Sequence, residues 1–423
     1  MTSPRYEVPF GRGTLSIQPP EGWMVDVADG AGRLPGAPPQ PVAPPQMFDA
    51  LVRRARQVII VFTDATRPGP DRVLAERALA DLRVAGFPLE RVSFLCATGM
   101  HRASTPEEKR EKLGEAILNR HEVVDHRPAD AATVGDIDGI PVQVNRRLTV
   151  PGTLTIALGV VEPHQFAGYS GGAKTVVIGC GGAETIAATH GPRFLGRDGV
   201  RLGQVDGNPF QVFIRQAGRL TGPQWVYNVV LDQDYRVVNQ LSGPPDAVHD
   251  ALVGQARRLY ELPVQAPYDV VLAGVGAPKD VNLYQASRAA TYLGLSARPV
   301  IRPGGVIILP APIPEGAGQG PGEQNFITAL RGQADLAGMA ARMEMQGCQP
   351  GEQRAYLIAR LLRRYRVIVV GAEHPGVARD AHLAPVPTMD EAFALARVWC
   401  GARQAAPRLL IVPHALQTIP VPA

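Results

Sequence analysis

The chain has 423 residues, of which 45% are hydrophobic and 19% charged. This composition is typical of a globular protein, and the length allows two sizeable cores. The 43 basic and 39 acidic residues give a formal net charge of +4 without a long basic block, which argues against nucleic acid as a partner. No apolar run is long enough to span a membrane, and residues 1–11 lack the apolar core of a signal peptide, so we expect a soluble, cytoplasmic protein.

Strands, loops and helices alternate along the first part of the chain. A loop or arm rich in proline and glycine is followed by apolar strands, and each strand runs into a polar loop. Thr105 and Glu108 form a capping box that opens a helix. The expected ranges are the loop at 28–46, strands at 58–62, 92–95 and 154–161, and a helix at 71–84.

A second series of the same kind begins near residue 268. We expect strands at 269–273, 306–309, 366–370 and 409–412, and a helix at 284–295. The stretch 310–322 reads as a flexible loop of the kind that closes over a site. We therefore predict an α/β fold of two domains with mainly parallel sheets, 1–265 and 266–423, and an active site in the cleft between them.

Two rare residue types carry information. The four cysteines lie far apart and form no CxxC pair, so we expect reduced, buried thiols rather than disulfides or a zinc site. Only four of the 43 basic residues are lysines. Lys109 and Lys112 belong to a charged helical stretch where we expect solvent exposure, whereas Lys174 and Lys279 lie in glycine- and proline-rich loops and are candidates for chemistry. The cysteines are Cys96, Cys180, Cys348 and Cys400.

The stretch 162–190 has the highest density of residues that could carry chemistry. Its glycines, Gly171 and Gly172 among them, would leave backbone N–H groups able to approach an anion, although a tight structural turn is an equally good explanation of glycine alone. Three of the nine histidines, His101, His164 and His190, begin or end such loops. Each could transfer a proton or bind nickel, and the remaining histidines are expected to be structural or on the surface.

Five segments carry a resemblance to a known family over residues 62–289. They are FTDATRPGP (62–70), TGMHRASTPEE (98–108), EPHQFAGYSGGAK (162–174), ETIAATH (184–190) and APKDVNLYQASRA (277–289). In order and spacing these segments resemble the nickel-dependent lactate racemase family. The resemblance implies a racemase or epimerase of a small 2-hydroxy acid, an isomerase that depends on a nickel nucleotide.

The resemblance also implies a role for each matching residue. The cofactor would be pyridinium-3-thioamide-5-thiocarboxylic acid mononucleotide, the nickel-pincer nucleotide, bound covalently to Lys174, with His190 as a nickel ligand. His101 and His164 would be the acid/base pair, and Arg67 would bind the substrate carboxylate. The supporting residues would be Asp64, Thr66, Gly171 and Gly172 around the cofactor, and Tyr284, Gln285 and Arg288 on the substrate side.

The implied chemistry explains these residue types. Removing a proton from the α-carbon of a hydroxy acid would leave a poorly stabilised carbanion, whereas hydride transfer to an electron-poor pyridinium avoids it. One histidine would take the hydroxyl proton, and the other would return a proton after the hydride reaches the opposite face of the planar keto acid. The cofactor would come from dedicated biosynthetic enzymes.

One residue departs from the lactate-specific pattern. Arg288 stands four residues after Tyr284, where a lysine is expected. A general replacement of lysine by arginine in this chain explains it, but so does a preference for a longer, branched or dicarboxylic hydroxy acid.

Two other functions remain as alternatives. A non-catalytic carrier of the nickel nucleotide would need Lys174 and His190 but not His101, His164 and Arg67. An NAD-dependent oxidoreductase would need a GxGxxG loop after the first strand, where the sequence has DATRPGP.

Overall fold

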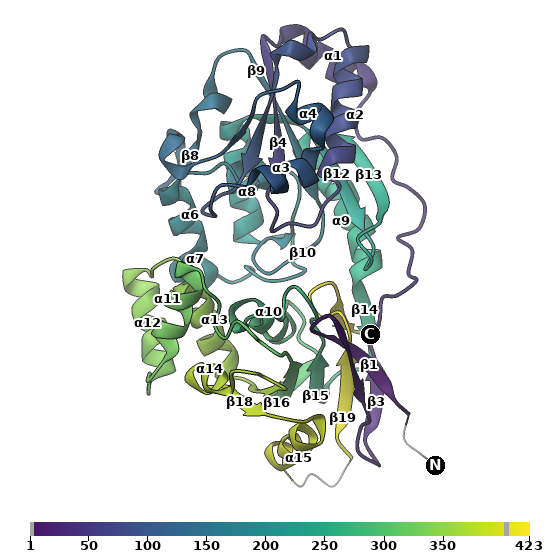
Figure 1. Ribbon diagram of the computed structural model, residues 1–423, viewed down its shortest axis with the longest axis vertical. Coiled ribbons are helices and arrows are strands. Elements are labelled where there is room, and N and C mark those ends of the chain that lie inside the picture. Colours follow the sequence, from purple (N-terminus) through teal and green to yellow (C-terminus); the bar gives the residue numbers. More distant parts are fainter. Residues whose placement is uncertain (1–3, 402–405) are drawn as a thin grey trace.

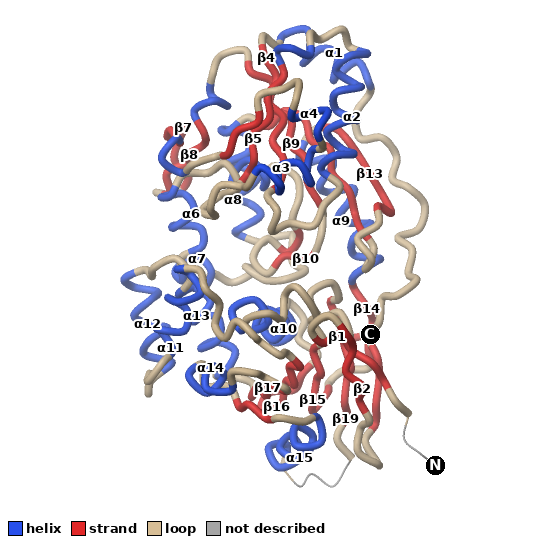
Figure 2. Tube along the Cα trace, in the orientation of Figure 1, coloured by secondary structure: helices blue, strands red, loops and turns tan. Residues whose placement is uncertain are grey.

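Two six-stranded sheets, one above the other along the longest axis, form the frame of the molecule (Figure 1). This computed structural model describes residues 4–401 and 406–423. Helices flank both sheets, and loop segments lie between the sheets (Figure 2). Within the described part of the chain, no helix is both long and apolar enough to cross a membrane. The predicted α/β class with two mainly parallel sheets is confirmed.

The first sheet has the strand order β13-β12-β9-β4-β5-β6. Its strands are parallel except for β13, which runs antiparallel to β12. Because β9, β4 and β5 are parallel neighbours, the loops after their carboxyl ends meet at one edge of the sheet. The strands are β4 (Gln57–Thr63), β5 (Val92–Ala97), β6 (Val123–Asp125), β9 (Thr153–Val160), β12 (Pro223–Leu231) and β13 (Val237–Gly243).

The second sheet is parallel throughout, in the order β18-β17-β16-β15-β19-β3. Its edge strand β3 comes from the N-terminal end of the chain and pairs with β19. The division predicted at residue 265 did not anticipate this, because a short, half-polar strand carries no signal of its partner. The strands are β3 (Met24–Val27), β15 (Tyr268–Ala273), β16 (Ile301–Pro310), β17 (Arg366–Val370), β18 (Ala384–Val386) and β19 (Arg408–Val412).

The remaining elements connect and cover the sheets. The helices are α1 (Pro45–Arg54), α2 (Asp71–Val84), α3 (Pro106–Leu113), α4 (Glu115–Leu118), α5 (Lys174–Val177), α6 (Ala183–His190), α7 (Pro192–Leu195), α8 (Pro209–Thr221), α9 (Pro245–Tyr260), α10 (Leu283–Gly294), α11 (Pro321–Leu330), α12 (Leu336–Gln346), α13 (Glu352–Leu362), α14 (Pro375–Asp380) and α15 (Met389–Cys400), with 3₁₀ turns at Leu89–Arg91, Pro128–Asp130 and Arg146–Thr149. The short strands are β1 (Tyr6–Phe10), β2 (Gly13–Ile17), β7 (Ala131–Ile137), β8 (Ile140–Asn145), β10 (Pro163–His164), β11 (Gly168–Tyr169), β14 (Glu261–Val264) and β20 (Ile419–Pro422).

The central strands of the first sheet are buried on both faces. Along β4, Ile60 joins a cluster with Leu74 and Leu82 of α2, whereas the next residue back, Ile59, joins a cluster on the other face with Val248 of α9. This alternation follows from the two-residue period of a strand. Burial on both faces explains why the sequence of β4 is an unbroken apolar run. It also fixes the position of the sheet edge from which the strand-end loops emerge.

Two local predictions have different outcomes. The helix at 71–84 and the capping box of Thr105 and Glu108 are confirmed. The stretch 310–322 is not a free loop: its backbone is hydrogen-bonded to the segment before α10, from Ile313 to Asp280 and from Glu315 to Val281, and Ile313 is fully buried. Its buried apolar residues, Ala311, Ile313 and Ala317, belong to a hydrophobic cluster that includes residues of α10 and α11.

Candidate active site

A cavity of about 320 Å³ opens at the edge of the first sheet where β9, β4 and β5 end. It is lined by the strand-end loops, by α5 and α6, and by a segment between α12 and α13 from the C-terminal part of the chain. Six residues expected from the sequence to carry chemistry line it together. They are Asp64, Arg67, His101, His164, Lys174 and His190.

His101 is held by a carboxylate. It follows β5, and its Nδ1 lies 2.6 Å from Oδ2 of Asp64, a residue that follows the neighbouring strand β4. Burial disfavours the charged form of Asp64, but hydrogen bonds from His101 and Thr66 outweigh it, so the pKa of this carboxyl is below its usual range. An ionised Asp64 accepts a hydrogen bond from Nδ1–H of His101. In the neutral form of the ring, this tautomer has its lone pair on Nε2. Thr66, which does not line the cavity, donates from its backbone and hydroxyl to Oδ1 of Asp64.

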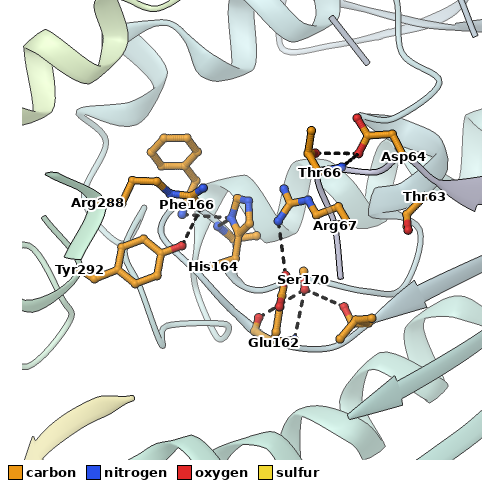
Figure 3. A network of polar contacts seen from close by, with 12 residues as sticks. Thr63, Asp64, Thr66, Arg67, Glu162, His164, Phe166, Ser170, Arg288 and Tyr292 are labelled. Atoms are coloured by element: carbon orange, nitrogen blue, oxygen red, sulfur yellow. Dashed lines mark hydrogen bonds and ion pairs between the residues drawn. The ribbon is translucent and has the colours of Figure 1, made fainter. Parts of the chain in front are cut away.

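His164 is held in the opposite way. It lies in the two-residue strand β10 and is only 5% exposed. Its Nδ1 accepts from the backbone N–H groups of Phe166 at 3.3 Å and Ala167 at 3.2 Å (Figure 3). Burial, followed by the nearby charges of Lys174 and Arg67, lowers its pKa well below the usual value. The ring is therefore neutral and carries its proton on Nε2, so His164 offers a donor where His101 offers an acceptor.

Lys174 begins α5, directly after the glycine-rich turn. Burial, with the nearby Arg67 adding to it, lowers the pKa of the Lys174 amine to about 7, against the opposing effect of Glu162. Much of the amine is therefore neutral near pH 7 and able to act as a nucleophile. Such a state is unusual for lysine and is what a covalent attachment site needs.

The glycines before Lys174 lie in closely packed backbone. Gly171 has a φ of +94°, and a Cβ there would lie 2.5 Å from Val161. The N–H of Gly172 donates to the Asn228 side chain at 2.7 Å and is not available to an anion, so the expectation of a free N–H at Gly172 was wrong. Gly171 lines the cavity and Gly172 does not.

His190 is the last residue of α6 and lines the cavity, and its Nδ1 lies 3.1 Å from the hydroxyl of Thr189. Its ring meets the edges of Phe166 and Phe210, with centroids 5.7 Å and 5.3 Å away. Burial lowers its pKa to about 3, with Lys174 adding to the effect, so the imidazole is neutral and keeps a lone pair that a metal could bind. Among the described residues, no group of three or more His, Cys, Asp or Glu side chains is placed to hold a metal ion.

Arg67 enters the cavity from the loop after β4, and its guanidinium contacts Oε1 of Glu162 at 3.4 Å. The loop itself is held by Lys112, whose ammonium donates to the carbonyl of Arg67 at 2.6 Å and to Asp71 at 2.7 Å. Lys112 is not exposed as expected but largely buried, and Lys109 is likewise paired with Asp125 at 2.7 Å. The charged sequence around them reflects ion pairs from α3 to Asp71 of α2 and to Asp125 of β6 rather than a solvated surface.

Replacing Lys112 by methionine should destabilise the protein. Asp71 is 3% exposed, so its charge would lose a buried partner, a change that costs roughly 3–5 kcal/mol. Urea unfolding followed by circular dichroism measures this. Arg110→Met, at an exposed ion pair on the same helix, is the matched control and should change stability by less than about 1 kcal/mol. Equal effects of the two substitutions would show that the Lys112 contacts carry no stability.

The residues expected on the substrate side have mixed placements. Tyr284, Gln285 and Arg288 all belong to α10, and none of them is among the residues that line the cavity. Arg288 nevertheless lies close enough to His164 to contribute to its lowered pKa. In Figure 3 the guanidinium groups of Arg67 and Arg288 lie on opposite sides of His164.

One wall of the cavity was missed from the sequence. Cys348, Gln349, Pro350 and Gln353 line it from the segment that leads into α13. None of these four lining residues is charged, and their spacing matches no motif that suggests a site. Only the three-dimensional fold brings them to the edge of the first sheet. All four cysteines are free thiols, as predicted, although Cys348 and Cys400 are partly exposed.

Comparisons with known proteins cover most of the chain. Residues 37–203 match the family described as lactate racemase N-terminal domain, and residues 264–419 match the lactate racemase C-terminal domain. A lactate racemase from Lactiplantibacillus plantarum is 29% identical over 376 residues, 88% of this chain and 87% of the relative. One from Thermoanaerobacterium thermosaccharolyticum is 26% identical over 409 residues, 92% and 93% of the two chains.

Two solved structures have the same fold. The lactate racemase apoprotein from T. thermosaccharolyticum matches with a TM-score of 0.85 at 24% identity, over 99% of this chain and 100% of that chain. A protein from Thermotoga maritima matches with a TM-score of 0.63 at 18% identity, over 90% and 99%.

Proposed function

Because the chain belongs to the lactate racemase family, we propose that it interconverts the stereoisomers of a small 2-hydroxy acid. The observation that supports this most is the pair of histidines in one cavity, one offering a proton acceptor and the other a donor. A reaction that passes through a planar keto acid needs a proton removed from the hydroxyl oxygen and a proton returned to it.

The residues around the cavity fit a nickel-pincer nucleotide tethered to Lys174. A partly neutral amine suits a covalent thioamide link, and the neutral imidazole of His190 suits a nickel ligand. A single imidazole does not make a metal centre, so the other nickel ligands would come from the nucleotide. When bound, the pyridinium ring would supply an acceptor for the α-hydrogen, which leaves as a hydride.

The chain's own residues would orient the substrate and move its protons. Arg67 would bind the carboxylate, since a guanidinium has about five N–H donors and the contact with Glu162 uses only one. His101 would take the hydroxyl proton on Nε2, with Asp64 stabilising the imidazolium that forms. His164 would donate a hydrogen bond from Nε2 to the same oxygen, and the His101 imidazolium would return its proton to that oxygen when the product forms.

The test of this function is a chiral assay of the complete enzyme. The protein is produced together with enzymes that make the nickel nucleotide, its intact mass is measured, and single enantiomers of 2-hydroxy acids are followed to racemic mixtures by chiral chromatography. We expect interconversion only in protein that carries the added mass. A protein that carries nickel and the added mass but interconverts no 2-hydroxy acid would instead be a carrier.

Arg67→Lys should weaken catalysis while leaving the cofactor attached. Lysine keeps the positive charge but loses the planar pair of donors, and one lost charge-assisted hydrogen bond costs roughly 1.5–3 kcal/mol. We expect kcat/KM to fall about 10- to 100-fold, mainly through KM. Steady-state kinetics on both enantiomers measure the change, and unaltered constants would remove Arg67 from the substrate site.

A further inference from the structure

Two arginines of the C-terminal part of the chain, the half-buried Arg288 and the buried Arg354, have only neutral hydrogen-bond partners. Arg288 of α10 donates to the side chains of Gln285 at 3.3 Å and Tyr292 at 3.1 Å. Arg354 of α13 is 4% exposed and donates to Thr291 at 3.1 Å and Gln165 at 3.2 Å. The Nε atom of each is buried without a hydrogen-bond partner, and within the described residues neither guanidinium forms an ion pair.

This is not how the chain treats other buried cations. Lys109 and Lys112 are each paired with a carboxylate at 2.7 Å. A buried charge without a counter-charge is costly, because the interior solvates it poorly. The two guanidinium groups also repel each other. Burial, followed by the charge of Arg288, lowers the pKa of Arg354 to about 10. A bound anion between or beside the two guanidinium groups would supply the missing negative charge and stabilise them.

The two arginines adjoin the candidate active site. Arg354 bonds to Gln165, the residue next to His164, and stacks over the ring of Tyr284. The Arg288 guanidinium lies across His164 from Arg67 (Figure 3). Lys279 belongs to the same region: burial, followed by the charges of Arg288 and Arg67, lowers its pKa to about 8. Positive charge therefore flanks His164 on two sides, and of Arg67, Arg288 and Lys279 only Arg67 forms an ion pair among the described residues, with Glu162.

One carboxylate does not account for both sides. The proposed function already assigns the α-carboxylate of the substrate to Arg67. We propose that Arg288, supported by Arg354, binds a second carboxylate, so that the preferred substrate is a 2-hydroxy dicarboxylic acid whose reacting carbon lies near His164 between the two. This inference rests on the proposed function and names its substrate class. It also explains why position 288 is an arginine rather than a lysine, because a guanidinium can bind a carboxylate with two parallel hydrogen bonds.

The test compares two substrates that differ only in charge. Cofactor-loaded enzyme is assayed with 2-hydroxybutanedioate and with its 4-carboxamide, which has the same shape but a neutral end. We expect kcat/KM to be about 10- to 100-fold higher for the dicarboxylate, the value of one charge-assisted hydrogen bond. Arg288→Met should remove most of this preference, and Arg288→Lys should restore part of it. Arg363→Met, at an exposed arginine after α13, is the control and should keep the preference.

A second measurement does not depend on turnover. Calorimetric titration of the same protein with the two compounds should show tighter binding of the dicarboxylate, and Arg354→Met and Arg288→Met should each reduce the difference. Equal affinities and equal kcat/KM values for the two compounds in the unmodified protein would overturn the inference. If the two compounds behave equally but monocarboxylic hydroxy acids are racemised, the proposed function still holds and only this inference fails. If the dicarboxylate binds selectively but no hydroxy acid is interconverted, only the proposed function fails.

Discussion

Lys174→Ala should abolish both the covalent adduct and the catalysis. Among the described residues that line the cavity, Lys174 is the only lysine. Burial lowers the pKa of its amine to about 7, so part of it is a neutral nucleophile. Without the tether, the group that accepts the α-hydrogen is not retained, and activity should fall to the uncatalysed background, a loss of at least about a million-fold. Intact mass, nickel content and the chiral assay should change together.

The matched control for the tether is Lys279→Ala. Lys279 is a half-buried lysine whose pKa is lowered to about 8, but it lies on the loop before α10 rather than beside the glycine turn. Its replacement should leave the added mass in place. Peptide mapping that finds the adduct on Lys279, or on no lysine, would refute the assignment. The rate of attachment should also rise with pH and level off above about pH 7, because the protonated amine predominates below the lowered pKa and is not a nucleophile.

Much of this site follows from sequence because strand-end loops are local features. The apolar runs that end near Asp64, His101 and His164 were recognisable as strands, and the parallel order β9-β4-β5 then places their loops together. The rarity of lysine left Lys174 and Lys279 as candidates, and the resemblance to a known family then favoured Lys174. These signals need only short stretches of chain and the rule that parallel strands present their carboxyl ends on one edge.

Long-range pairing accounts for what could not be predicted. The partner of Lys112 is Asp71, 41 residues away, and a run of charges gives no sign of which of its members will be buried. The strand at Met24–Val27 pairs with β19 near the other end of the chain. The cavity wall at 348–353 and the buried Arg354 depend on how α13 packs, which neither hydrophobic period nor motif reveals.

The histidine pair gives the second large effect. His101→Ala and His164→Ala should each suppress turnover of both enantiomers, because His101 would take and return the hydroxyl proton and the Nε2–H of His164 would stabilise the same oxygen in both directions. General acid/base losses of this kind are roughly 100- to 10,000-fold. Neither substitution should remove the adduct on Lys174 or the bound nickel. His374→Ala, at an exposed histidine, is the control and should leave kcat/KM unchanged.

The opposite proton states of the two rings predict a difference between more conservative variants. A glutamine side chain offers N–H donors but cannot accept a proton at neutral pH. His164→Gln could therefore keep the hydrogen bond that Nε2 offers, whereas His101→Gln would lose the lone pair that Asp64 maintains. We expect His164→Gln to retain at least about tenfold more activity than His101→Gln, whose loss should match that of His101→Ala. Equal losses would show that the hydrogen bonds to Nδ1 do not fix the two roles.

Deuterium at the α-carbon distinguishes hydride transfer from proton abstraction. If the α-hydrogen moves as a hydride to a bound acceptor and returns, it does not exchange with water, and the product should keep most of the label. Neither histidine then handles the carbon-bound hydrogen, and both act only on the oxygen. A racemase that abstracts the α-proton would instead transfer it to an imidazole, from which it exchanges with solvent. Mass spectrometry of substrate and product at partial conversion measures retention. Loss of deuterium at the rate of racemisation would refute the hydride mechanism even if every histidine variant behaved as expected.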